Sequence, residues 1–127
     1  MIRLRDVTYL VGDHDEALVF FVDALGFAVR QDETFPDGWR RVVVGPSDGG
    51  TGLLLALATE GAPVGRQVGQ DVAFFLETDD FAAQHERMTR HGVRFREEPR
   101  HEPYGTVAVF EDPYGGLWDL IEPPGRP

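Results

Sequence analysis

The feature that most limits what this chain can fold into is a repeat at a spacing of about 65 residues. Each half opens with an apolar strand, continues through an aspartate suited to capping a helix, and reaches a glycine suited to ending that helix. These features are Val7–Val11, Asp13 and Gly26 in the first half, and Val72–Leu76, Asp80 and Gly92 in the second. One half alone would leave a sheet face uncovered, so we expect both halves in one domain.

Each half is predicted to be a βαβββ unit of an α+β domain. In the first unit, Glu16 stands three residues after Asp13, which is the spacing of a capping box. The predicted strands span 6–11, 27–30, 39–44 and 53–58 in the first unit, and 72–77, 93–97, 106–110 and 117–122 in the second. The single domain 1–127 then divides into a module at about 2–58, a glycine-containing linker at about 59–70 and a module at about 71–123.

Two motifs resemble those of the vicinal oxygen chelate superfamily, which includes glyoxalases, bleomycin resistance proteins and extradiol dioxygenases. The first runs from Leu10 through Asp13 to Phe27, and the second runs from Phe110 to Glu122, with Gly116 where the family usually has Asn or His. The resemblance covers about residues 2–123. It implies two pseudo-symmetric βαβββ modules that form a cupped mixed sheet with helices on the outer face.

The resemblance also implies that the cup holds a ligand. Alternate residues of a strand share a face, and this parity assigns Trp39, Arg41, Phe75 and Glu77 to the cup. His101 and Tyr104 lie in the loop before the seventh predicted strand, which often borders the ligand in the superfamily. The aromatic members suit a small planar molecule, and Arg41 or Glu77 would orient it. The predicted ligand pocket is therefore Trp39, Arg41, Phe75, Glu77, His101 and Tyr104.

Metal-dependent members of the superfamily bind one divalent ion through side chains on the first, fourth, fifth and eighth strands. The resemblance places these four positions on Asp6, near Ala56, on Ala73 and on Asp119. Two methyl groups cannot ligate an ion, so Asp6 and Asp119 would be an incomplete set for a weakly bound divalent metal. The alternative is that both are polar residues at a water-filled cup, and that the protein has no cofactor.

Composition argues against several partners. A formal net charge of −10 without a basic stripe disfavours nucleic acid. No apolar run approaches the roughly 20 residues that cross a membrane, and the N-terminus has no signal-peptide core. With no cysteine, the sequence suits a cytoplasmic protein. Among the histidines, His14 is expected in solvent in the first helical turn, and no Ser-His-Asp spacing indicates a nucleophile.

Three functions remain open. The alanines at two of the four metal positions favour a small-molecule-binding protein, similar to the antibiotic-sequestering members, that encloses a planar aromatic ligand as a homodimer. The alternative is a divalent-metal-dependent lyase, isomerase or dioxygenase that uses Asp6 and Asp119, in which the ion polarises vicinal oxygens of the substrate. The third is a structural or regulatory domain. The sequence leaves open whether the protein is an enzyme.

Overall fold

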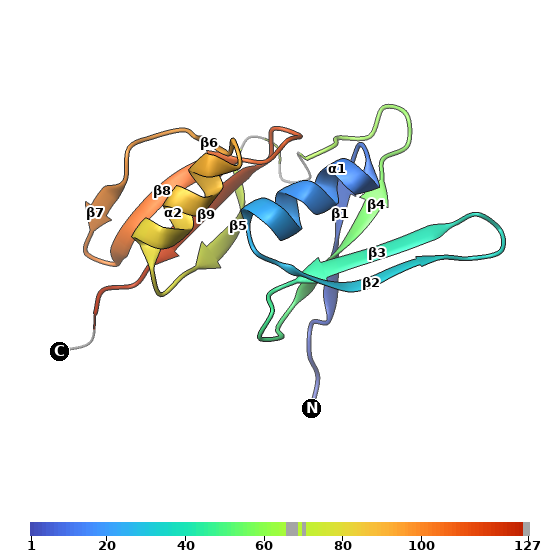
Figure 1. Cartoon of the computed structure of the whole chain (residues 1–127), viewed down its shortest axis with the longest axis horizontal. Coiled ribbons are helices and arrows are strands. Elements are labelled where there is room, and N and C mark those ends of the chain that lie inside the picture. Colours follow the sequence, from blue (N-terminus) through green and yellow to red (C-terminus); the bar gives the residue numbers. More distant parts are fainter. Residues whose placement is uncertain (66–68, 70, 126–127) are drawn as a thin grey trace. The chain divides into compact units, whose positions relative to one another are not determined.

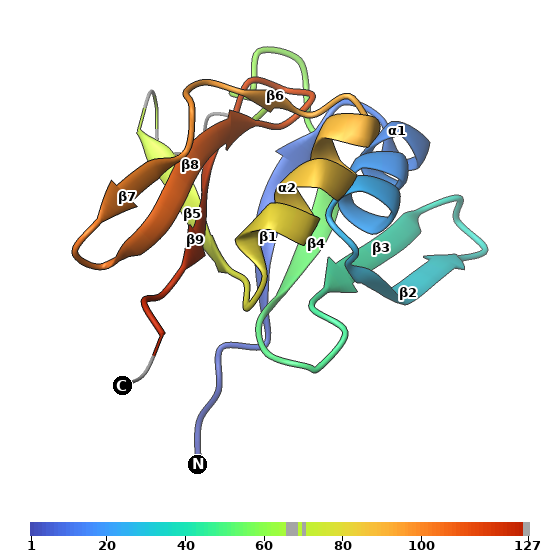
Figure 2. The ribbon, with the colours of Figure 1, turned by 60° about the vertical axis from the view of Figure 1, so that its left-hand side comes forward.

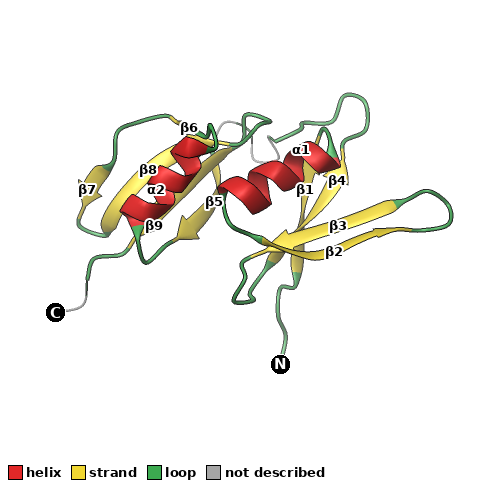
Figure 3. Cartoon of the chain, viewed as in Figure 1, coloured by secondary structure: helices red, strands yellow, loops and turns green. Residues whose placement is uncertain are grey.

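The computed structural model describes residues 1–65, 69 and 71–125 of the 127-residue chain. It contains two compact units, an N-terminal unit of residues 1–64 and a C-terminal unit of residues 65–127. Each unit combines strands and helical segments in the order of a βαβββ module, as Figure 3 shows. Across the described residues, no helix has both the length and the apolar character needed to span a membrane.

The N-terminal unit is a four-stranded sheet with one helical segment. Strand β1 runs parallel to β4, and the remaining pairs are antiparallel, in the order β1-β4-β3-β2. In Figure 1, β2 and β3 form a long hairpin at one side of this sheet. The elements are β1 (Asp6–Val11), α1 (His14–Leu18), η1 (Val19–Ala24), β2 (Ala28–Thr34), β3 (Arg40–Gly45) and β4 (Gly52–Leu57).

The core of this unit lies between its helical segment and one sheet face. The strand register places Tyr9 of β1 beside Leu55 of β4, and Leu55 beside Val42 of β3. All three side chains are buried on the same face of the sheet. The ring of Phe21 meets that of Tyr9 edge-on, with centroids 6.3 Å apart. The opposite face of the same strands is not covered by this helical segment.

The first helix differs from the predicted regular amphipathic helix. Its start is as expected, because the Asp13 side chain accepts a hydrogen bond from the Glu16 N–H at 2.8 Å. From Val19 to Ala24 the segment is a π-helix, in which the Leu25 N–H reaches the Phe20 carbonyl five residues back. The wider turn lets Phe20 and Phe21 both become buried, with their rings edge-on at 5.1 Å.

The C-terminal unit repeats this plan with an extra strand. Its sheet has the order β5-β9-β8-β6, with β5 parallel to β9, and β7 pairs with β8. The elements are β5 (Val72–Glu77), α2 (Phe81–Arg90), β6 (Arg94–Phe95), β7 (Arg100–Glu102), β8 (Gly105–Glu111) and β9 (Leu117–Glu122). Strands β5 and β9 have the predicted bounds, whereas part of the predicted loop before β8 forms β7 (Figure 2).

A continuous row of stacked rings forms the core of this unit. His85 of α2 stacks on Phe95 with centroids 4.1 Å apart, and Phe95 contacts Phe110 of β8. Phe110 stacks in turn on Trp118 of β9, whose side chain is almost fully buried. Helix α2 therefore covers the Trp118 face of its sheet, and the predicted α+β fold class is confirmed.

Candidate functional site

A hollow in the N-terminal unit opens where β3 and β4 separate. Their pairing ends at Val42 and Leu55, and beyond this point Ala56 and Leu57 pair only with β1. The resulting space has a volume of about 450 Å³, within the range of small-molecule sites. It is lined by His14, Gly38, Trp39, Arg40, Leu54, Leu55, Ala56 and Leu57, and we refer to it as the Trp39 hollow.

Trp39 is the largest side chain of this hollow, and it is held in place by the hairpin. The backbone N–H of Trp39 donates to the Asp37 carboxylate at 2.9 Å, and the backbone carbonyl of Trp39 accepts from the Phe35 N–H at 2.7 Å. The indole stacks on the Phe35 ring with centroids 5.3 Å apart and an interplanar angle of 19°. The Trp39 side chain is still 55% exposed, so a fixed aromatic surface remains open to a ligand.

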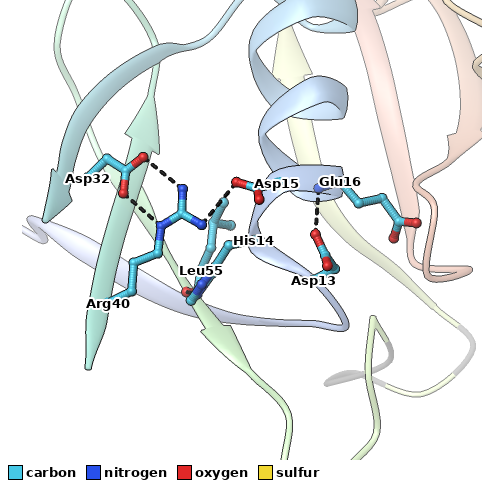
Figure 4. Close-up of polar contacts among 7 residues, drawn as sticks. All are labelled: Asp13, His14, Asp15, Glu16, Asp32, Arg40 and Leu55. Carbon is cyan, nitrogen blue, oxygen red and sulfur yellow. Dashed lines mark hydrogen bonds and ion pairs between the residues drawn. The ribbon is translucent and has the colours of Figure 1, made fainter. Parts of the chain in front are cut away.

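Arg40, which lines the same hollow, links the β2–β3 hairpin to the start of α1. Arg40 donates from Nε and Nη2 to the Asp32 carboxylate and from Nη1 to Asp15 at the start of α1, at 2.8–2.9 Å (Figure 4). The hydrogen bond from Arg40 lowers the pKa of Asp32, and the two carboxylates raise that of Arg40. This network ties the β2–β3 hairpin to the helix.

His14 is buried, so the expectation that it lies in solvent is wrong. Its exposure is only 9%, and Nε2 donates to the Leu55 carbonyl at 2.8 Å (Figure 4). That carbonyl belongs to β4, 41 residues along the chain. Local sequence spacing has no access to such a contact, and the pairing of helix start and strand end appears only in the folded unit.

In the C-terminal unit, the sheet face opposite Trp118 carries the other predicted residues. Register places Phe75, Asp119 and Val109 side by side on three neighbouring strands. The next row on the same face holds Glu77, Ile121, Val107 and Arg100. Phe75 is 68% exposed, whereas Asp119 in the middle of the sheet is buried. Phe75, Glu77 and Asp119 therefore share one face, as strand parity predicted.

Asp119 is an unusual residue on this face. Within the described part of the chain, its buried Oδ1 has no hydrogen-bond partner. Burial raises the pKa of its carboxyl above the ordinary value, because a charged carboxylate is poorly solvated there. The Arg100 charge opposes this rise, and the Glu97 charge adds to it.

A charged cluster borders the same face. Arg100 donates to Glu97 at 2.8 Å and to Glu102 at 2.9 Å, and a further hydrogen bond to Tyr104 helps to raise its pKa. Burial alone would raise the pKa of Glu97, but hydrogen bonds from Arg100 and the Val109 N–H hold it below its usual value. The cluster therefore stays charged beside Asp119, and the nearby Tyr104 side chain is 54% exposed.

Two further predicted pocket residues, His101 and Arg41, lie neither in the Trp39 hollow nor on the sheet face of Phe75. His101 pairs with Thr106 and lines a separate hollow of about 740 Å³ between α2 and β7–β8, on the sheet face opposite Phe75. Arg41, in the N-terminal unit, donates from Nη1 to the Gln31 side chain at 2.7 Å. The sequence analysis grouped His101 with Phe75 because the resemblance placed the loop of His101 beside the ligand, and it did not anticipate β7.

The four positions that correspond to the superfamily's metal ligands do not form a ligand set here. Asp6 forms an ion pair with Arg5 at 3.3 Å, and the side chains of Ala56 and Ala73 have no donor atoms. Asp119 Oδ1 is the buried side-chain oxygen that has no hydrogen-bond partner among the described residues. In that described part, no three His, Cys, Asp or Glu side chains gather in a way that could hold a metal ion.

These features define a class of small protein, in which paired βαβββ units present sheet faces that their helices leave open. The chain belongs to the Glyoxalase/Bleomycin resistance protein/Dioxygenase superfamily, whose family model matches residues 3–120. An uncharacterised protein of Shewanella frigidimarina (strain NCIMB 400) is 40% identical over 121 residues, which is 91% of this chain and 90% of that protein.

Solved structures share the fold over nearly the whole chain. TnmS3, an antibiotic binding protein from Streptomyces sp. CB03234, superposes with a TM-score of 0.81 at 28% identity, and the match covers 98% of each chain. UcmS2 superposes with a TM-score of 0.80 at 31% identity, covering 95% of this chain and 98% of that one. The resemblance inferred from the two sequence motifs is thereby confirmed.

Proposed function

We propose that this protein binds and sequesters a small planar aromatic molecule without transforming it. The observation that carries the proposal is the Trp39 hollow, where an exposed indole is fixed by Phe35 above an apolar wall. A rigid aromatic surface binds planar ligands well, because little side-chain entropy is lost on binding. Similarity to TnmS3, an antibiotic binding protein, supports a small-molecule ligand.

In this proposal the C-terminal unit offers a second aromatic surface at Phe75, beside Asp119 and Glu77, and Tyr104 would be a further contact for the ligand. Arg41 would orient polar groups of a ligand in the N-terminal unit. The predicted homodimer in the cytoplasm belongs to the same proposal, and sedimentation velocity tests the dimer as a species of twice the chain mass.

The test of the function is a comparison of wild type with Trp39→Ala. Calorimetric titration with 2-naphthol as the planar probe should give saturable binding, and Trp39→Ala should lower the affinity about tenfold or more, because stacking area is lost. Val19→Ala removes another exposed apolar side chain, on the helix, and should leave the affinity unchanged. Equal affinities in wild type and Trp39→Ala would exclude this hollow as the binding site.

Sequestration is distinguished from catalysis by the fate of the probe. After prolonged incubation with stoichiometric protein, 2-naphthol extracted and analysed by mass spectrometry should be recovered unchanged. A new product that forms at a rate proportional to protein concentration would contradict sequestration and favour the enzyme alternative.

A further inference from the structure

The Trp39 hollow contains one polar ring that the proposed function does not yet use. His14 lines the hollow together with Trp39, although most of its surface is buried. Each ring nitrogen of an imidazole can donate or accept a hydrogen bond, and a ligand that displaces water from one of them must supply its partner. The partners of these two atoms therefore decide what His14 can recognise.

The hydrogen bond to Leu55 assigns the tautomer of His14. A carbonyl oxygen only accepts, so Nε2 carries the hydrogen in the 2.8 Å contact. In the neutral imidazole, Nδ1 is then an acceptor with a free lone pair. Among the described residues, no donor reaches this Nδ1.

The neighbouring Arg40 guanidinium does not serve as the hydrogen-bond donor to His14 Nδ1. Arg40 also lines the hollow, but Nε, Nη1 and Nη2 donate to the carboxylates of Asp32 and Asp15 (Figure 4). The charge of Arg40 is thus matched by two acidic groups, and an anionic ligand would meet these carboxylates and the imidazole lone pair. The chemistry of the hollow favours an uncharged ligand that carries a hydrogen-bond donor.

We propose that Nδ1 of His14 accepts a hydrogen bond from a hydroxyl or N–H group of the planar ligand that packs on Trp39. The ligand class is accordingly an aromatic ring system with a phenolic or amino donor, rather than a bare or fully alkylated ring. This inference rests on the proposed function, because it specifies what the Trp39 hollow selects. His14 would set specificity, and Trp39 would supply most of the contact area.

The experiment compares two probes that differ only at the donor, 2-naphthol and 2-methoxynaphthalene, by calorimetric titration. Wild type should prefer 2-naphthol by about tenfold, because the methoxy group of the other probe cannot donate and leaves Nδ1 without a hydrogen-bond partner in the complex. His14→Phe keeps an aromatic ring but lacks both nitrogens, so the preference should fall to near unity. His91→Phe alters an exposed histidine at the end of α2 and should keep the preference.

A second measurement on wild type covers the case in which His14→Phe fails to fold. The ¹⁵N resonance of the His14 Nδ1 should shift on adding 2-naphthol, and it should stay in place with 2-methoxynaphthalene. Equal binding of both probes with an unmoved Nδ1 resonance would overturn the role of His14 and leave the Trp39 site intact. If neither probe binds wild type, the proposed function and this inference both fail.

Discussion

The indole N–H of Trp118 donates to Oδ2 of Asp112 at 2.8 Å, which joins the core of the C-terminal unit to the turn before β9. The other carboxylate oxygen of Asp112 accepts from the backbone N–H groups of Tyr114 and Gly116, each at 2.9 Å. One buried carboxylate therefore fixes both the turn and the orientation of Trp118. Because side chains alternate along a strand, the same contact directs Asp119 to the opposite face.

Replacement of Asp112 by alanine should destabilise the fold strongly. The change leaves three N–H donors without their acceptor, and two of these hydrogen bonds are buried. We therefore expect a loss of about 3 kcal/mol in the free energy of unfolding. Urea denaturation measures it. Asp48→Ala, at an exposed turn residue, serves as the control and should change stability by less than about 0.5 kcal/mol. A similar small effect for Asp112→Ala would refute the structural role.

Asp119→Asn should make the protein more stable at neutral pH than wild type. Burial raises the pKa of Asp119 in the folded state above its ordinary value of 3.8, so the unfolded chain releases this proton first. Ionisation then favours unfolding, and wild type loses stability as the pH rises above 3.8 until the folded-state pKa is passed. The asparagine cannot ionise and avoids this loss.

Urea denaturation of both proteins at several pH values between about 4 and 8 checks this prediction. The advantage of Asp119→Asn should grow with pH and then level off. A difference that is constant across the range would show that the carboxyl of Asp119 titrates alike in the folded and unfolded chains.

Two glycines at the same end of the N-terminal sheet should respond differently to alanine. A Cβ at Gly52 would lie 2.9 Å from the Val44 carbonyl oxygen, which is backbone and cannot move aside. The three atoms nearest to a Cβ at Gly45 all belong to the guanidinium of Arg30, the end of a long side chain. We expect Gly52→Ala to lower the free energy of unfolding by about 1–3 kcal/mol, and Gly45→Ala to lower it by less. Thermal and urea unfolding measure the two, and the reverse order would contradict the packing described for Gly52.

The donor set predicts weak metal binding. Ala56 and Ala73 supply no ligand atom, and Arg5 pairs with Asp6, so calorimetry with Mn²⁺, Ni²⁺, Zn²⁺ and Fe²⁺ should give no saturable binding below millimolar concentration. Elemental analysis of purified protein gives the complementary measurement. A stoichiometric ion that is lost in both Asp6→Ala and Asp119→Ala would instead favour the metal-dependent enzyme.

Much of the architecture could be predicted from the chain because its signals are local. The caps at Asp13 and Asp80 each accept the expected N–H three residues later, and β5 and β9 have the predicted bounds. Alternation along β5 also predicted that Phe75 and Glu77 share a face. These patterns depend on residues a few positions apart.

The tertiary structure alone decided the features that depend on distant partners. His14 is buried because its imidazole meets a carbonyl 41 residues away, and the Trp39 hollow exists because the β3–β4 pairing stops at Leu55. The separation of His101 from Phe75 follows from β7, which forms only by pairing with β8. A sequence sets which side chains alternate on a strand, but pairing between strands determines which of them meet, and that pairing is a property of the whole folded unit.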